Sequence, residues 1–540
     1  MFILSQELLK KLFFIALIIF SVFLFFSKLD KIPESGYASY DGAFYSDIAL
    51  HIYNGDGLLT SISSFDQFYK VLPRPTQVYP FWPLVGGSLA HLFPHSVKFV
   101  IRLEFINLIF SIFSIYVLYF LILNILKKES SKKYIYAFIF TIAFNCMATY
   151  YYYSIKPYTE SLAIFLILLS LLIFFNVLDY ANKKYNSFMS FLLGVLLFLS
   201  FLTRSQSVIS IFVVFLFSVY FLITKQISKK SFFITWITSL LLLTSYFYYF
   251  YLIKAEYFDL SSFFIFQNNY DLSKYTPLPH VKSNPIYLRI LHGLKAFFAF
   301  DYTSGVPNSG ILIFLLPATL IKFKYYNIKF KIIIITGGFY LLSLLSMEMT
   351  ITLKWLFGHR HGILVLFLTL FSFLAFIIYL ETSEKFKNIY IFFFTSLILF
   401  SSVYSSRYVR NNDKSSKIRF SHKTVNKLYS FLISKQENLN RKLKILSLNS
   451  RNIVLFSGTT GYFFESRREN WKEYLIYKMR KLNIDYFIIN KYYDYYTKDK
   501  KDDYFTIMKD KTPKEFKLVK SFEDKKLGNW LGIYKLVSNK

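Results

Sequence analysis

Eleven long apolar runs divide this chain and decide what it can fold into. An apolar segment of about 20 residues is long enough to cross the hydrocarbon core of a bilayer as an α-helix. The runs lie near residues 12–27, 98–124, 134–151, 160–178, 188–203, 207–224, 232–252, 307–321, 332–350, 361–380 and 389–405. The pattern excludes a purely soluble enzyme, a disordered chain and a small secreted domain. It predicts a mainly α-helical, polytopic membrane protein with about eleven transmembrane helices.

Two features near the first runs narrow the class further. The first run follows Lys10 and Lys11 as a signal peptide would, but no small-residue cleavage site follows it. We therefore predict that it stays in the protein as a helix. The single cysteine, Cys146, excludes an intramolecular disulfide and a metal site built from cysteines.

The basic residues of the connecting loops predict the orientation of the chain. Alternate loops are rich in lysine: Lys127, Lys128, Lys132 and Lys133; Lys183 and Lys184; Lys225, Lys229 and Lys230; Lys322, Lys324, Lys329 and Lys331; Lys385 and Lys387. Because lysine and arginine are retained on the cytoplasmic side, we predict a cytoplasmic N-terminus in a plasma or inner membrane. Residues 28–97, 253–306 and 406–540 then face outward. Much of the net charge of +31 lies in these short loops, an arrangement that indicates membrane topology and not a nucleic-acid partner.

The tail, residues 406–540, differs from the rest in composition. It holds 31 Lys and Arg against 14 Asp and Glu, a balance that favours contact with anionic lipid headgroups. Its pattern also predicts a helix over 468–482 and strands at 453–456, 485–489, 516–519 and 530–534. We therefore expect a transmembrane domain over 1–405 and a small extracytoplasmic α/β domain over 406–540.

Ionisable residues cluster at the outer ends of the apolar runs. A charge at the centre of a membrane helix costs about 2.5–3.5 kcal/mol on insertion scales, so such residues mark function more often than chance. The candidates are Asp41, Asp47, Arg74, Lys156, Glu160, Arg204, His359, Arg360 and His361. A proton- or ion-coupled transporter needs such groups near the midplane. Their position favours a cavity on the outer side instead.

The first outer loop is the richest in candidates. Asp41 begins a segment that predicts a short interfacial helix with Phe44, Tyr45 and Ile48 on its apolar side. Asp41 is then either a helix N-cap or a carboxylate held at headgroup level for chemistry. Asp47 and His51 fall on another face, as part of a metal site or, more simply, as a solvated polar face.

A proline-aromatic segment follows at residues 79–84, with the sequence Tyr-Pro-Phe-Trp-Pro-Leu. Its two prolines predict a break in regular structure. The segment is either an interfacial aromatic anchor or a stiff loop that shapes one wall of a site.

These pieces together resemble the GT-C class of membrane glycosyltransferases, which use lipid-phosphate sugars. Protein O-mannosyltransferases, aminoarabinose transferases of lipid A and GPI mannosyltransferases belong to this class. The resemblance rests on Asp41, Tyr45 and Ala49 after the first run, on residues 79–84, on Lys156–Leu162, on Leu202–Ser205 and on Phe357–Arg360. It covers roughly residues 35–210 well and 350–380 weakly.

The resemblance implies a function and a set of roles. It implies transfer of one sugar, with mannose suggested by the Pro-Tyr-Thr-Glu-Ser stretch, from a polyprenyl-phosphate donor to a hydroxyl of a glycan, lipid or protein. Transfer would proceed by inverting displacement, with Asp41 as general base. Arg204 and Arg360 would bind the donor phosphate. Substrate-binding roles would also fall to Tyr45, Arg74, Lys156, Glu160 and His359.

Departures from the family pattern leave some points open. Gly42 follows Asp41 where many relatives carry a second acid, so the use of a divalent metal is unsupported and no cofactor is assigned. The Trp-Trp-Asp motif of oligosaccharyltransferases is absent, which disfavours transfer of a preassembled glycan to asparagine. The alternatives are an O-antigen ligase or polymerase, a flippase for lipid-linked sugars, and a membrane scaffold with a basic tail.

Overall fold

The computed structural model describes most of the chain in separate stretches, and the account below is confined to them. The described residues are 6–32, 40–62, 72–75, 80–126, 132–146, 148–179, 185–204, 206–254, 323–351, 371, 374, 377, 378, 422–447, 450–463, 471–490, 504–524 and 529–537. The chain divides into two compact units. The first holds residues 1–32 and 104–412, and the second holds residues 33–103 and 413–540.

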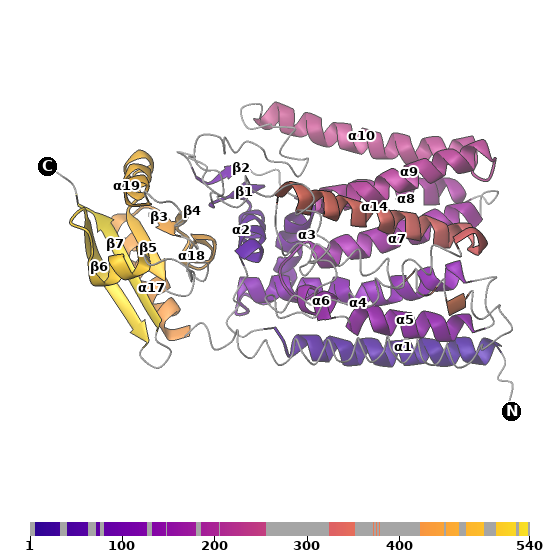
Figure 1. Cartoon of the computed structure of the whole chain (residues 1–540), viewed down its shortest axis with the longest axis horizontal. Coiled ribbons are helices and arrows are strands. Elements are labelled where there is room, and N and C mark those ends of the chain that lie inside the picture. Colours follow the sequence, from indigo (N-terminus) through magenta and orange to yellow (C-terminus); the bar gives the residue numbers. More distant parts are fainter. Residues whose placement is uncertain are drawn as a thin grey trace. The chain divides into compact units, whose positions relative to one another are not determined.

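The first unit is a bundle of apolar helices that run side by side (Figure 1). Its helices are α1 (Gln6–Leu29), α5 (Lys133–Cys146), α6 (Ala148–Tyr153), α7 (Glu160–Asp179), α8 (Asn186–Thr203), α9 (Ser207–Ile223), α10 (Lys229–Lys254) and α14 (Ile328–Ile351), with a short 3₁₀ turn, η4 (Phe323–Tyr325). Helix α4 (Phe99–Ile125) is divided between the two units after Leu103. Among the described residues, five helices are long and apolar enough to cross a membrane: α1, α4, α7, α8 and the Lys229–Tyr249 part of α10.

Most of the predicted spans fall on these helices. The predicted span at 134–151 is two helices, α5 and α6, with Met147 between them. The predicted spans at 307–321 and 389–405 lie outside the described residues, as does nearly all of 361–380. The structure therefore shows a multi-pass membrane protein, and the count of eleven spans stays a prediction.

Exposed apolar stripes show which helix faces meet lipid. On α1, Ile15, Ile19 and Phe23 are 54%, 64% and 68% exposed. Residues four apart lie on one face of a helix, so these three form a single apolar stripe. An exposed apolar stripe of that kind is suited to contact with the hydrocarbon of a bilayer. The opposite side of α1 packs inward through Leu17 and Leu24, which are buried.

The second unit contains a five-stranded mixed sheet in its tail part. The strands are β3 (Lys444–Ser447), β4 (Thr460–Phe463), β5 (Tyr486–Asn490), β6 (Phe516–Asp524) and β7 (Asn529–Leu536), in the order β4-β3-β5-β7-β6. The first three pair in parallel, and β7 pairs antiparallel with both β5 and β6. The helices of this part are α17 (His422–Leu439), α18 (Ser450–Ser457), α19 (Trp471–Leu482) and α20 (Tyr504–Asp510). The small mixed α/β character of the tail agrees with the prediction.

One tail prediction is wrong and several are confirmed. Residues 453–456, predicted as a strand, lie in helix α18. A four-residue apolar run cannot distinguish a buried strand from a short helix by periodicity. The helix predicted over 468–482 is α19, in which Tyr474, Leu475 and Leu482 are buried. Strands at 485–489, 516–519 and 530–534 are present as β5, β6 and β7.

Residues 33–97, most of the segment predicted to form the first outer loop, also belong to the second unit. They form α2 (Tyr40–Tyr53), the two-residue strands β1 (Leu59–Thr60) and β2 (Arg74–Pro75), α3 (Phe81–Leu89) and the 3₁₀ turn η1 (Ala90–Leu92). The predicted helix that starts near Asp41 is present as α2. The predicted break at 79–84 is wrong, because α3 begins at Phe81 and continues through Pro83. Proline is tolerated in the first turn of a helix, where its missing N–H would have no intrahelical partner.

Candidate functional site

The segment 154–159, which connects α6 to α7, carries the residues that the sequence pointed to. Asn107 on α4 fixes its backbone, because the Asn107 side-chain amide donates to the carbonyl oxygens of Lys156 and Tyr158. The Ser161 hydroxyl donates to the Ser154 carbonyl at 2.8 Å. Lys156, Thr159 and the first residue of α7, Glu160, are therefore held by contacts from two helices.

Glu160 forms a buried ion pair with Arg204, the residue that directly follows α8. Arg204 Nη1 donates to Glu160 Oε1 and, at 3.3 Å, to Thr159 Oγ1. Arg204 Nε donates to Gln206 Oε1 at 2.8 Å. Both charged side chains are buried, with 3% of Glu160 and 6% of Arg204 exposed. The substrate-binding roles predicted for Glu160 and Arg204 stay a prediction.

Lys156 lies beside a second carboxylate. Its Nζ is 4.0 Å from Oε1 of Glu104, which is fully buried on α4. Glu104 was not among the predicted site residues. A glutamate inside an apolar run of this length is the signal that could have identified it, because uncompensated charge is costly there.

Lys28 completes the group at the end of α1. Its ammonium donates to Ser111 Oγ at 2.5 Å and to Ser154 Oγ at 2.6 Å. The same nitrogen lies 5.0 Å and 5.5 Å from the ring centroids of Tyr150 and Tyr151. Sequence reasoning missed Lys28, although a lysine at the outer end of the first apolar run was available as a signal.

The face of α4 that meets these residues has helical spacing. Glu104, Asn107 and Ser111 are three and seven residues apart, so they lie on one side of the helix. They contact Lys156, the 154–159 backbone and Lys28 in turn. We call Lys28, Glu104, Lys156, Glu160 and Arg204 the buried charge cluster. When all five are ionised, its three cations and two anions leave one net positive charge.

The remaining predicted residues are distributed differently. Asp41 is the second residue of α2, and Tyr45 is buried on α2, 6.2 Å from Trp82 between ring centroids. Arg74 lies in β2, in register with Thr60 of β1. These three belong to the second unit, whereas Lys156, Glu160 and Arg204 belong to the first. His359, Arg360 and His361 lie outside the described residues.

Asp47 and His51 are not on a solvated face, contrary to the simpler expectation. Asp47 Oδ2 accepts from Thr60 Oγ1 and from the Ser61 N–H, both at 2.8 Å. Burial raises the pKa of the Asp47 carboxyl, and His51, Thr60 and Ser61 oppose that shift. His51 lies within 2.8 Å of both an Asp56 carboxylate oxygen and Ser61 Oγ. No group of three or more potential metal ligands occurs in the described part of the chain.

Comparisons with known proteins place the fold. No protein-family model matches the sequence, and no curated protein matches it significantly. ArnT from Cupriavidus metallidurans bound to undecaprenyl phosphate matches with a TM-score of 0.53 and 8% identity, over 96% of this chain and 97% of that one. ArnT in the apo state matches with a TM-score of 0.52 and 10% identity over the same shares.

A weaker likeness exists to a second enzyme. The oligosaccharyltransferase AglB from Archaeoglobus fulgidus, in complex with an inhibitory peptide and a dolichol-phosphate, has a TM-score of 0.48 and 12% identity, over 87% of this chain and 69% of that one. The ArnT match spans both chains almost end to end and includes the helical and tail units described above. The chain is thus a multi-pass membrane protein with the fold of the GT-C membrane glycosyltransferases.

Proposed function

We propose that this protein is an integral membrane glycosyltransferase. It moves one sugar from a polyprenyl-phosphate donor to an acceptor hydroxyl at the extracytoplasmic face of the plasma or inner membrane. The observation that carries the proposal is the buried charge cluster at the α6–α7 connection, set in an ArnT-like fold. The solved ArnT relative is bound to undecaprenyl phosphate, a donor carrier of the proposed class. Mannose is the first sugar to test, because the Pro157–Leu162 stretch resembles that of mannosyltransferases.

The chemistry of such a donor explains why cations are needed. When the anomeric carbon is attacked, the bond to the phosphate oxygen breaks and the lipid phosphate gains negative charge. Preorganised cations stabilise charge that develops in a transition state, and Arg and Lys are the usual phosphate partners. Lys156 and Arg204 supply that charge here, and Glu104 and Glu160 hold them in place.

The acceptor hydroxyl must lose its proton during the attack. We assign that step to Asp41 as general base, near the start of α2. A positioned general base contributes typically about 10²–10⁴ in rate. One displacement at the anomeric carbon inverts its configuration. Tyr45, Arg74, His359 and Arg360 are the remaining substrate-binding candidates, with a glycan, lipid or protein as acceptor.

The deciding experiment uses the full-length protein in proteoliposomes with radiolabelled polyprenyl-phosphate sugars, mannose first. We expect label to pass to an acceptor in a new glycosidic bond. The Asp41→Asn variant should lower kcat by roughly 10²–10⁴, which is the loss of a general base. Asp30→Asn is the matched control, because Asp30 is exposed and pairs with the neighbouring Lys31 at 3.2 Å.

Three results would contradict the proposal. Wild-type transfer by Asp41→Asn would remove the base assignment. Movement of intact donor between leaflets without bond formation would indicate a flippase, and transfer of a preassembled glycan would indicate a ligase. Metal dependence is tested in the same assay by adding a chelator and then restoring activity with Mg²⁺ or Mn²⁺.

A further inference from the structure

Helix α2, which carries Asp41, is packed tightly against α3 on one side. A side chain at Gly87 of α3 would place its Cβ 2.5 Å from the Ala49 carbonyl oxygen and 2.9 Å from the Ile52 Cβ. Only glycine permits this close approach of two helices. Tyr45 and Trp82 add an aromatic contact between the same helices. The first outer loop therefore fixes one side of α2 by itself.

Residues of the distant tail pack against another part of α2. A hydrophobic cluster joins Ala43 and Leu50 of α2 with Leu455 and Phe456 of α18 and with Val100. Leu455 is 8% exposed, and Ala43 is fully buried. Ala43 stands two residues after Asp41, so the tail packs beside the turn of α2 that carries the proposed base.

Backbone pairing joins the same two segments. Ile62, after β1, forms a parallel bridge with Gly461 of β4, and the Gly461 N–H donates to the Ser61 carbonyl at 3.0 Å. The Ser61 N–H in turn donates to Asp47 on α2. A hydrogen-bonded path therefore runs from the edge of the tail sheet through Ser61 to α2.

Gly461 also sets the distance between β4 and α18. A Cβ at this position would lie 3.0 Å from the Ser450 Cβ and would collide with the Val454 side chain. Any larger residue at position 461 must push α18 away from the strand. Because α18 bears Leu455 and Phe456, such a displacement acts directly on the contact with α2.

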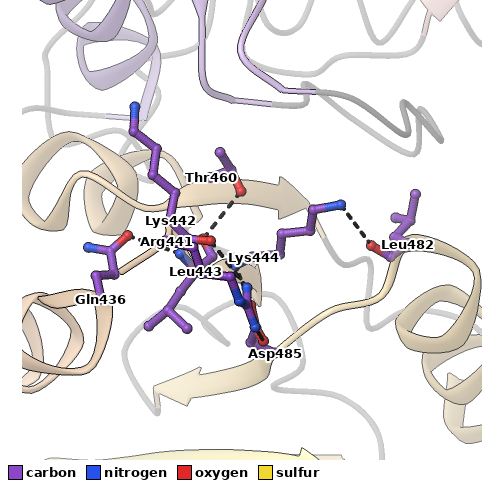
Figure 2. A network of polar contacts seen from close by, with 8 residues as sticks. All are labelled: Gln436, Arg441, Lys442, Leu443, Lys444, Thr460, Leu482 and Asp485. Carbon is purple, nitrogen blue, oxygen red and sulfur yellow. Dashed lines mark hydrogen bonds and ion pairs between the residues drawn. The ribbon is translucent and has the colours of Figure 1, made fainter. Parts of the chain in front are cut away.

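A polar network within the tail holds the segment before β3 against β4, where the Thr460 hydroxyl donates to the Leu443 carbonyl at 3.2 Å (Figure 2). Gln436 donates to the Ser457 carbonyl at the end of α18 and accepts from the Leu443 N–H. Asp485 accepts from Arg441 at 2.9 and 2.5 Å and from the Lys444 N–H at 2.9 Å. These bonds fix the segment that enters β3, the strand that pairs with β4. These bonds link α17, the start of β3 and α18, which bears the surface packed against α2.

We propose that the part of the tail in the second unit, residues 413–540, positions α2 for catalysis, with Leu455 and Gly461 as positioning residues that touch neither donor nor acceptor. This inference rests on the proposed function, because the position of α2 affects catalysis only if Asp41 on that helix is the general base. It assigns to the tail a part in the reaction beyond contact with lipid headgroups.

The placement is tested first by a measurement that needs no activity. The full-length protein is made with Cys146→Ser, which removes its only cysteine, together with Ala43→Cys and Leu455→Cys. Oxidation, or a short bifunctional thiol reagent, should join the two introduced thiols within one chain, as shown by mass spectrometry after proteolysis. The control pair Ala43→Cys and Leu475→Cys should stay unjoined, because Leu475 belongs to a separate tail cluster. Failure of the first pair in folded protein would overturn the inference even in an active enzyme.

Kinetics then test the positioning role. Leu455→Asp should lower kcat at least 10-fold with little change in the donor KM, because it displaces α2 and leaves the donor-binding cations untouched. Leu455→Ile should restore most of the rate. The control variant is Leu518→Asp. Leu518 is exposed on β6, so the kcat of this variant should match that of the wild type. If the introduced thiols join but the wild type has no transferase activity, the proposed function is refuted and the contact between the tail and α2 stands. If Leu455→Asp keeps the full kcat, the positioning role alone is refuted.

Discussion

The Glu160–Arg204 pair shows at the scale of single residues how the cluster is built. Bringing two charges out of water is costly, and their attraction offsets that cost only when both partners are present and well hydrogen-bonded. Arg204 satisfies this condition through Thr159 and Gln206 as well as Glu160. The pair thus contributes more to the orientation of the guanidinium than to net stability.

Removing both members of this pair should cost less stability than the sum of removing each one alone. Arg204→Met leaves the Glu160 carboxylate buried without its main counterion, which typically costs about 3–5 kcal/mol. The double variant with Glu160→Gln should lose less than the sum of the two single changes, because the residues are in direct contact. Thermal unfolding of the detergent-solubilised protein measures all four members of the cycle. Strict additivity would show that the two side chains do not interact.

The buried Asp47 predicts a pH dependence of stability in the second unit. Its pKa is raised above the ordinary 3.8, with burial as the main cause. A raised folded-state pKa means that the stabilising contribution is complete below about pH 3.8 and is lost as the pH rises through the folded value. Unfolding curves from pH 4 to 7 should therefore show a loss of stability that Asp47→Asn removes. An unchanged slope in that variant would contradict the assignment.

Close helix packing is the main feature at the scale of elements. Gly194 on α8 faces α10 so closely that a Cβ would lie 2.5 Å from the Thr235 carbonyl oxygen and 2.9 Å from the Thr238 Cβ. Small residues allow helix backbones to approach in a membrane, where apolar contact with lipid is as favourable as contact with a neighbour. Gly338 on α14, in contrast, has no atom within 4 Å of its Cβ position.

This contrast gives a matched pair of substitutions. Gly194→Ala should destabilise the protein by about 1–3 kcal/mol, because the helices must separate to admit the methyl group. Gly338→Ala should leave stability unchanged or raise it by up to about 1 kcal/mol, the gain in helix propensity. Thermal unfolding in one detergent compares the two variants directly. Equal effects would show that α8 and α10 are not packed as described.

At the scale of elements, the sequence predicts where the helices lie better than it predicts which residues of different helices contact one another. The runs that became α4, α7 and α8 were identifiable because a membrane helix needs a long, uninterrupted apolar segment. The run at 453–456 was misassigned because four apolar residues fit both a strand and a helix. Glu104 and Lys28 were overlooked because their partners lie on other helices, and no local pattern shows which residues meet in space.

At the scale of the whole molecule, the main feature is the division of the chain into two compact units. The predicted border at 405/406 remains a prediction, and the contacts group residues 33–103 with the tail. The pairing of Ile62 with Gly461 joins segments separated by most of the chain, so no local sequence signal could predict it. Residues 28–97 and the tail are both predicted to face outward. Two segments that fold into one unit must lie on the same side of the membrane.

Orientation is testable at this scale with reporters. The lysine-rich loops predict that the N-terminus is cytoplasmic and that the tail is extracytoplasmic. A reporter active only outside the cytoplasm, fused after Lys540, should therefore be active, and the same reporter fused before Met1 should be inactive. The reverse result would overturn the sidedness on which the proposed outer-face reaction depends.

The bond between Ser61 and Gly461 has a consequence for biogenesis. Ribosomes release a chain from its N-terminus, so α2 emerges long before β4 and α18 exist. Helix α2 therefore cannot reach its final packing until β4 and α18 have been synthesised. A chain that stops before residue 450 should leave this side of α2 without its partner.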